Sequence, residues 1–377
     1  MNFDYNEEQQ LLADSIKRFI DKDYDFETRK YVASAEGYSA EVWGTLAEMG
    51  LLGLPFSPDY EGFGGGAVDL MSVMECMGAG LVVEPYLPTV TAAQFVARAG
   101  SEAQKKAILP AVASGELKDG LRADRSRGAL RPRARRGRGE ESGAGWTLDG
   151  VKQVVIGAPQ ADQLVVSART SNDGDRGISL FLVDARAAGV SMKAYRTIDE
   201  LRAADVGFKG VQLGADALIG KPGEGLAHIE AVVDFATALL CAEAVGAIKY
   251  ANDATLEYIK TRKQFGVPIG AFQALQHRMV DMVISWEQAR SMACMACARV
   301  DSEKDAGERK RLISAAKIRI ADACRHVSQE AIQLHGGMGM TEEMKVSHTF
   351  RRLTMIAQQF GDADHHLERF AALDKVA

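Results

Sequence analysis

Hydrophobic positions in the first third of the chain recur at helical spacing. Asn6 precedes an acidic turn, Glu7-Glu8-Gln9, and an apolar stripe follows from residue 11 to residue 20. Because Asn is a favoured N-cap and acidic side chains suit a helix N-terminus, we expect a helix to begin directly after Asn6. Ser101 is expected to cap a second helix in the same way. Residues 1–116 are therefore predicted to form an N-terminal α-helical domain.

Between about residues 145 and 220 the pattern changes to short runs rich in β-branched and aromatic residues. Four such runs, separated by turn residues, are 146–156, 163–169, 178–183 and 205–213. They predict an antiparallel sheet or small barrel within a middle β-domain, residues 117–222.

Long helices are predicted from about residue 223 onward. Phe235–Thr261 is rich in Ala, Leu and Glu and lacks proline, and Glu308–His335 continues similarly until the glycine pair Gly336-Gly337. This order of elements predicts an α+β multidomain chain that ends in a C-terminal four-helix bundle, residues 223–377.

The composition agrees with a globular protein, since 47% of the 377 residues are hydrophobic and 25% are charged. We expect no membrane span, because no apolar run approaches the roughly 18 residues that one needs. The acidic N-terminus does not follow the basic-then-apolar order of a signal peptide, and cytoplasmic residence is the expectation.

No metal site is expected from the cysteines and histidines. Cys294 and Cys297 form a C-x-x-C inside a helical stretch with no second pair, so they are interpreted as packed helix thiols. His365 and His366 diverge by about 100° if they lie on a helix. We expect them to be solvated or to lie at an interface.

Two motifs carry a family resemblance. The stretches Tyr258–Gln273 (YIKTRKQFGVPIGAFQ) and Gln333–Thr341 (QLHGGMGMT) closely resemble the signatures of acyl-CoA dehydrogenases, in the expected order and spacing. Ser101–Pro110 and Leu148–Lys152 also match, so the resemblance spans nearly the whole chain. It implies the acyl-CoA dehydrogenase fold.

The resemblance implies FAD as cofactor, held by residues that one subunit contributes to the flavin site of its neighbour. An arginine at a helix end offers a rigid fork to a diphosphate, and paired glycines let a dinucleotide approach the backbone closely. The expected cofactor-binding residues are Arg262, Gln264, Phe265, Phe272, Gln273, Gln333, Gly336 and Gly337. The alternative for these positions is an ordinary helix end and C-cap.

The reaction implied by the resemblance is α,β-dehydrogenation of an acyl-CoA thioester. In the family a glutamate removes the α-proton, the β-hydride passes to the flavin, and an electron-transferring flavoprotein accepts the electrons. No nucleic acid and no membrane are expected among the partners.

The position of the family's base departs from the expected pattern. Gly361 stands where the glutamate is expected, and Ala236 occupies the alternative family position. Asp362 is the nearby candidate for a catalytic base, although it is displaced by one residue. Glu243 lies on the right helix two turns later and is interpreted as structural.

The C-terminal sequence resembles the small subunit of pimeloyl-CoA dehydrogenase and related heteromeric enzymes. This resemblance implies a larger homologous subunit that carries the base, and pimeloyl-CoA or a similar thioester as substrate. Two alternatives stay open. One is a homomeric dehydrogenase, flavin oxidase or monooxygenase that uses Asp362, and the other is a scaffold subunit without chemistry.

The tract 121–139 is strongly basic, with eight arginines and one acid in a chain whose formal net charge is −6. In the family this segment forms a strand with an Ala-x-Thr-Glu-Pro motif that contacts the flavin ring, and the motif is absent from this sequence. A local frameshift is the favoured hypothesis, since a one-base shift of plausible codons yields a sequence of the expected kind. A solvated basic loop or electrostatic nucleic-acid binding are the alternatives.

Overall fold

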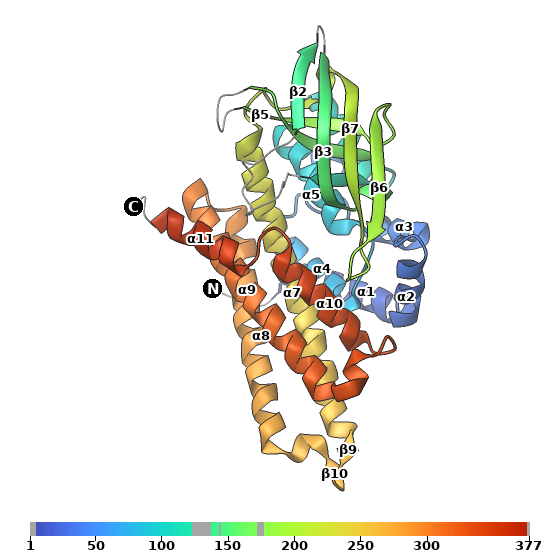
Figure 1. Ribbon diagram of the computed structural model, residues 1–377, viewed down its shortest axis with the longest axis vertical. Helices are drawn as coiled ribbons and strands as arrows, with labels where there is room; N and C mark the ends of the chain where they lie inside the picture. Colours follow the sequence, from blue (N-terminus) through green and yellow to red (C-terminus); the bar gives the residue numbers. More distant parts are fainter. Residues whose placement is uncertain (1–4, 123–136, 143–144, 172–176, 375–377) are drawn as a thin grey trace. The chain divides into compact units, whose positions relative to one another are not determined.

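The computed structural model describes residues 5–122, 137–142, 145–171 and 177–374, with side chains for 5–118, 145–171 and 177–373. The chain forms two compact units, drawn by sequence colour in Figure 1. The helical unit comprises residues 1–31, 67–82 and 237–377, and the sheet unit comprises residues 32–66 and 83–236. Each unit therefore draws on the N-terminal 116 residues.

The helical unit is built almost entirely from α-helices. They are α1 (Glu7–Asp23), α4 (Ala67–Gly80), most of α7 (Gly225–Thr261), α8 (Gln273–Val300), α9 (Ala306–His335), α10 (Lys345–Gln358) and α11 (Ala363–Asp374). The predicted cap of α1 is confirmed, because Asn6 accepts from the backbone of Gln9 while the Gln9 side chain accepts from the backbone of Asn6.

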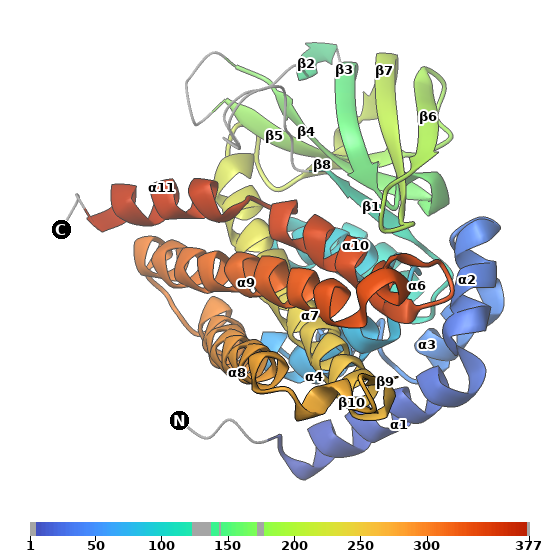
Figure 2. The same cartoon turned by 60° about the horizontal axis from the view of Figure 1, so that its bottom comes forward.

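Helices α7, α8, α9 and α10 form the predicted four-helix bundle (Figure 2). Polar contacts join each neighbouring pair around the ring. They are Asn252 to the Met282 carbonyl, Ser285 to His326, Lys317 to the Ile356 carbonyl, and Arg352 to Glu243. The bundle is closed because the fourth contact returns to α7.

Helix α4 packs unusually close to α7. A Cβ on Gly78 would lie 2.0 Å from the Glu243 carbonyl oxygen, and one on Gly246 would lie 1.8 Å from the Glu75 carbonyl oxygen. Two glycines thus let the helix backbones touch, and no larger residue fits at either position.

Helix α7 begins at Gly225, close to residue 223, where the sequence predicted that helices resume. An 18-residue window within it has a mean hydropathy of 1.8. By length and composition alone it could cross a membrane, although the sequence was expected to hold no such run. Within the described residues, 89% of that window is buried inside the protein, as in the core helix of a bundle.

The sheet unit combines helices with one large sheet. Its helices are α3 (Ala40–Glu48), α5 (Tyr86–Ala99) and α6 (Glu102–Ala113), while α2 (Phe26–Ser34) spans the boundary between the units. Its strands are β1 (Asp119–Arg122), β2 (Gly137–Ser142), β3 (Gly145–Ile156), β4 (Gln163–Arg169), β5 (Ile178–Asp184), β6 (Val190–Arg196), β7 (Arg202–Gly214) and β8 (Leu218–Ile219). Ser101 caps α6 as predicted.

The sheet runs in the order β6-β7-β3-β2-β4-β5-β8, and β1 pairs with β4. The four predicted strands are observed as β3, β4, β5 and β7. Where these four strands pair with one another, β3 with β7 and β4 with β5, they run antiparallel as predicted, whereas β1, which was not predicted, runs parallel to β4. Strand β6 was not predicted, because it has no run of buried residues. Its residues alternate between half-buried and exposed along most of its length.

Alternate residues of the central strands enter two different cores. On β4, Val165 packs with α5 and α6, whereas Leu164 and Val166 face a second core formed by the sheet itself. Trp146 of β3 contacts Phe181 of β5 with ring centroids 5.3 Å apart, although these strands are not neighbours in the sheet. The sheet therefore curls over its second core.

Residues 123–136, which hold most of the arginine-rich tract, lie outside the described residues. The three interpretations of that tract stay open.

Candidate functional site

A groove of about 880 Å³ lies in the helical unit. It is formed by the end of α7, the beginning of α8 and the end of α9. The first and last of these lie about 75 residues apart in the sequence. Its volume falls in the range of roughly 300–1,000 Å³ that is common for small-molecule sites.

One wall of the groove is a tight hairpin between α7 and α8. Strands β9 (Lys263–Gln264) and β10 (Val267–Pro268) pair antiparallel, and the turn residues Phe265 and Gly266 have φ values of 55° and 82°. This turn projects the Phe265 ring outward, where it is 89% exposed. The ring meets Phe272 edge-on at 6.1 Å between centroids.

The opposite wall is the end of α9 and the short 3₁₀ helix η6 (Gly336–Met340). Gly336 has φ 60° and ψ −142°, a conformation that disfavours any residue with a side chain. A Cβ on Gly336 or Gly337 would meet nothing within 4 Å. Both glycines therefore leave open space beside an accessible backbone.

Seven of the eight predicted cofactor residues line this one groove. They are Arg262, Gln264, Phe265, Phe272, Gln333, Gly336 and Gly337. Gln273 is the first residue of α8 and is exposed, but it does not line the groove. The structure thus brings together two motifs that lie about 70 residues apart in the sequence.

The groove contains two guanidinium groups in different states. Arg278 is held by an ion pair with Glu330. The side chain of Arg262 has no hydrogen bond or ion pair with any described residue, and it is exposed. Arg262 is therefore the cation that is available to an anionic ligand, such as a diphosphate.

His335 lies beneath the groove and was not anticipated from the sequence. Its ring stacks on Tyr258 with centroids 4.4 Å apart, and its Nδ1 is 2.8 Å from the Ala331 carbonyl oxygen. Since a carbonyl only accepts, Nδ1 carries the proton and Nε2 is an acceptor. Nε2 is buried and has no partner among the described residues, and burial lowers the pKa of His335.

The sequence also missed Tyr258 and Arg278. Tyr258 lies one helical turn before Arg262, so helical spacing alone would have placed it on the same face. Arg278 lies beyond the end of the first motif, Tyr258–Gln273, and gave no signal, because nothing in the sequence pairs it with Glu330.

The predicted base lies elsewhere in the helical unit. Asp362 precedes α11, and its carboxylate accepts a hydrogen bond of 2.9 Å from the backbone N–H of His365. This contact is a helix N-cap. Gly361 has no side chain to offer, and Ala236 is fully buried in α7.

Glu243 has the structural role that the sequence analysis gave it. Its two carboxylate oxygens accept hydrogen bonds of 2.6 and 2.8 Å from Arg352, and both side chains are only 8% exposed. Such a bidentate pair occupies both oxygens of the carboxylate, which are therefore not available to a substrate.

The expectation for His366 is wrong. The side chain is 1% exposed, with hydrogen-bonding contacts to Ser314 and to the Phe360 carbonyl, instead of being solvated. The interpretation of Cys294 and Cys297 as packed helix thiols is confirmed, because both are free thiols on α8. Burial raises the pKa of each thiol. Among the described residues, no group of three or more His, Cys, Asp or Glu could hold a metal.

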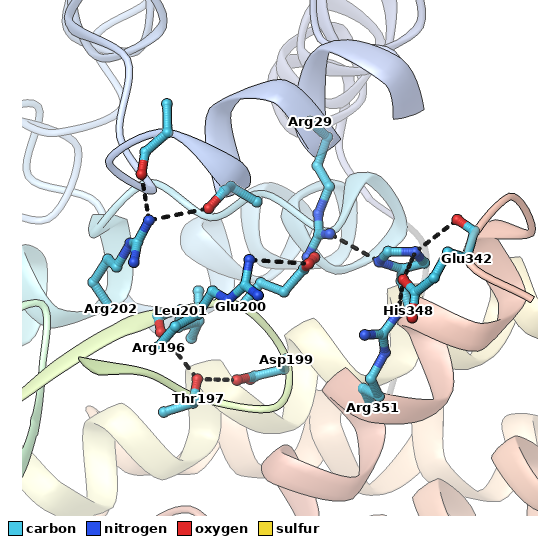
Figure 3. Close-up of polar contacts among 12 residues, drawn as sticks. Arg29, Arg196, Thr197, Asp199, Glu200, Leu201, Arg202, Glu342, His348 and Arg351 are labelled. Carbon is cyan, nitrogen blue, oxygen red and sulfur yellow. Dashed lines mark hydrogen bonds and ion pairs between the residues drawn. The ribbon is translucent and has the colours of Figure 1, made fainter.

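Another histidine is engaged in a polar network away from the groove. Figure 3 shows Arg29, which is 3.0 Å from Nδ1 of His348, and Glu342, which lies near Nε2 of the same ring. Because arginine only donates, Nδ1 of His348 is an acceptor. Glu342 also accepts from Arg351 at 2.8 Å. Each group is committed to a neighbour, so this network is structural.

Figure 3 also shows a separate network within the sheet unit. There Arg202 donates to the carbonyls of Ala33 and Ala35, and Thr197 bonds Asp199 in the β6–β7 turn. These contacts fix the turn and the chain after α2.

The chain matches a single family along most of its length. Residues 6–116 match the acyl-CoA dehydrogenase N-terminal domain, residues 128–211 the middle domain, and residues 223–372 the C-terminal domain.

Curated relatives align over nearly the whole chain. Acyl-CoA dehydrogenase fadE12 of Mycobacterium bovis is 29% identical, with 94% of this chain and 93% of the relative covered. Probable acyl-CoA dehydrogenase YngJ of Bacillus subtilis is 26% identical, with 98% of each covered. The CarC subunit of the caffeyl-CoA reductase-Etf complex of Acetobacterium woodii is 26% identical, with 92% and 93% covered.

Solved structures share the fold. A variant of the Tcur3481-Tcur3483 steroid ACAD superposes with a TM-score of 0.87 at 27% identity, with 98% of each chain covered. PigA with FAD and proline superposes with a TM-score of 0.92 at 26% identity, with 100% of each chain covered.

Proposed function

The chain belongs to the acyl-CoA dehydrogenase superfamily, and from this membership we propose that it serves FAD-dependent α,β-dehydrogenation of an acyl-CoA thioester as a subunit without a catalytic base. The observation that carries the proposal is a contrast. Seven of the predicted cofactor residues come together in one groove, whereas the positions expected for the base hold Gly361 and Ala236.

The groove fits the adenosine diphosphate end of FAD. Arg262 is an unpaired cation for the diphosphate, and the Gln333 amide has no partner among the described residues. The backbone at Gly336 and Gly337 is open to close approach. When bound, FAD supplies the hydride acceptor that this chemistry needs.

The aromatic pair Phe265 and Phe272 supports a site completed by a second chain. Phe265 is 89% exposed beside the groove, and further apolar residues are exposed on the helix that follows the hairpin, namely Val280, Val283 and Ile284 of α8. A run of this kind at spacings of three and four residues forms an apolar stripe that suits a partner helix. A partner that covers this stripe would bring its own flavin to the groove.

A larger homologous subunit is the proposed partner. A chain without a base needs a neighbour that has one, and the 27%-identical Tcur3481-Tcur3483 structure is a two-component assembly by its name. The 26%-identical CarC is a subunit of an Etf complex, which supports an electron-transferring flavoprotein as acceptor. Pimeloyl-CoA is the proposed substrate, on the resemblance of the C-terminal sequence.

The experiment is an anaerobic titration of the flavin absorbance. We expect pimeloyl-CoA to leave the flavin oxidised when this chain is mixed with FAD alone, and to bleach it when the larger subunit is added. Rapid bleaching with the isolated chain would show that it contains its own base and would contradict the proposal.

A further inference from the structure

The turn between α10 and α11, residues 360–362, is held more firmly than a connecting loop requires. Phe360 and Gly361 have φ values of 58° and 120°, so two consecutive residues lie in the left-handed half of conformational space. Such strain persists only where the surroundings hold it in place.

Lys317 of α9 holds the turn from one side. It is fully buried, and its Nζ donates to the carbonyls of Ile356, Ala357 and Gly361 at 2.9, 3.0 and 2.7 Å. An ammonium group has three donors, so all are used. Two of these carbonyls end α10, where a helix lacks internal partners and favours a cation. Lys317 thus ties α9, the end of α10 and Gly361 together.

His366 of α11 holds the turn from the other side. Nε2 is 3.1 Å from the Phe360 carbonyl oxygen, and Nδ1 is 3.2 Å from Oγ of Ser314. The carbonyl only accepts, so Nε2 carries a proton, and in the neutral ring the serine hydroxyl donates to Nδ1. These two contacts fix the ring at both nitrogens. Burial, together with the nearby Lys317 and Arg369 cations, lowers the pKa of His366 to about 2.

The two histidine rings fill the space beside Gly361. A Cβ at this position would lie 2.5 Å from Cδ2 of His365 and 2.7 Å from Nε2 of His366. Both distances are shorter than real Cβ contacts, and the His366 ring cannot move without losing its hydrogen bonds. Position 361 therefore accepts no side chain.

We propose that the 360–362 turn is a structural plug, fixed by Lys317 and His366, which excludes a base at position 361 by construction rather than through the loss of one side chain. The consequence for catalysis rests on the proposed function. The existence of the plug does not, and it is tested by thermal stability and hydrogen exchange without measuring enzyme activity.

The first test compares two glycine substitutions within the helical unit. Gly266 also has a positive φ, 82°, but a Cβ there would meet nothing within 4 Å. Gly266→Ala therefore reports backbone strain alone, whereas Gly361→Ala adds the collision with the histidine rings. We expect Gly361→Ala to lower the thermal midpoint by roughly 5 °C more than Gly266→Ala. Equal shifts would overturn the plug.

A second test avoids any change at the glycine. Lys317→Met keeps a similar length but leaves three carbonyls without a donor, and Lys304→Met on the exposed loop before α9 is its control. We expect faster backbone hydrogen exchange across residues 360–366 in Lys317→Met only. Unchanged exchange in that segment would contradict the role of Lys317.

The third test uses the full chain with FAD and asks whether a base can be restored. We expect Gly361→Glu to be destabilised and to show no bleaching on adding acyl-CoA. A Gly361→Glu chain as stable as the wild type, with the flavin bleached, would overturn the inference. If instead no assembly of the wild-type chain ever reduces flavin, the proposed function fails while the glycine comparison still decides the plug.

Discussion

At the scale of single residues, the groove depends on one free cation. Arg262 lies where α7 ends, and its guanidinium has no partner among the described residues, while Arg278 beside it is neutralised by Glu330. An exposed arginine without a partner has its full hydrogen-bonding capacity available to a diphosphate.

Replacing this cation should weaken cofactor binding. In the protein as purified, we expect Arg262→Gln to lower the affinity for FAD by about tenfold to a hundredfold, since a charge-assisted hydrogen bond contributes about 1.5–3 kcal/mol. Fluorescence titration of released flavin measures this. Arg325→Gln, which removes a guanidinium from an exposed pair with Asp322, is the control and should bind FAD normally.

The buried His366 ring should make the protein sensitive to acid. Its pKa is about 2 in the fold against 6.5 for an unperturbed histidine, so between these values the unfolded state binds more protons. The stabilising contribution is complete above pH 6.5 and falls at lower pH, by up to about 1.4 kcal/mol per pH unit.

Urea unfolding at pH 7, 6 and 5 measures this dependence. The free energy of unfolding should fall more steeply with acid in the wild type than in His366→Asn. The exposed His277→Asn variant should follow the wild type. Parallel curves for all three proteins would refute the assignment.

At the scale of helices and strands, the sequence predicted best those features that depend on neighbouring residues alone, such as the first turn of a helix. The caps of α1 and α6 follow from Asn6 and Ser101 with their glutamines three residues later. By contrast, β6 and the 360–362 turn depend on residues distant in the sequence. No local pattern shows that Lys317 reaches Gly361 or that His366 packs against it.

The cap of α6 offers a local measurement. We expect Ser101→Ala to cost about 1 kcal/mol of helix stability, which speeds hydrogen exchange in the first turn of α6 about fivefold. Ser114→Ala, at the other end of the same helix, removes only a contact with the Ala111 carbonyl and should leave the first turn unchanged. Identical exchange in the two variants would show that the capping box contributes nothing.

At the scale of the whole molecule, the order of helices, strands and helices predicted the fold, and the three family matches follow the same order. The pattern could not show that residues 1–31 and 67–82 join the C-terminal helices in one unit. That grouping depends on packing, such as the glycine crossing of α4 and α7 and the Glu243–Arg352 pair that closes the bundle.

Removing one partner of the buried Glu243–Arg352 pair should cost much stability, whereas replacing both partners with apolar residues should cost little. Arg352→Met leaves Glu243 as an uncompensated buried charge, and we expect a loss of about 3–5 kcal/mol of stability. The double variant Glu243→Met, Arg352→Met should recover most of this loss in thermal or urea unfolding. Arg351→Met removes a more exposed pair with Glu342 and should cost less than about 1 kcal/mol.

The most direct test of the base-free subunit is Asp362→Asn in the complex with the larger subunit. Asparagine caps a helix as well as aspartate does, so α11 should be retained while the candidate base beside position 361 is removed. We expect the rate of flavin bleaching by acyl-CoA to stay within about twofold of the wild type. A fall of about a hundredfold or more, the usual cost of losing a general base, would show that Asp362 removes the proton and that this chain performs the chemistry itself.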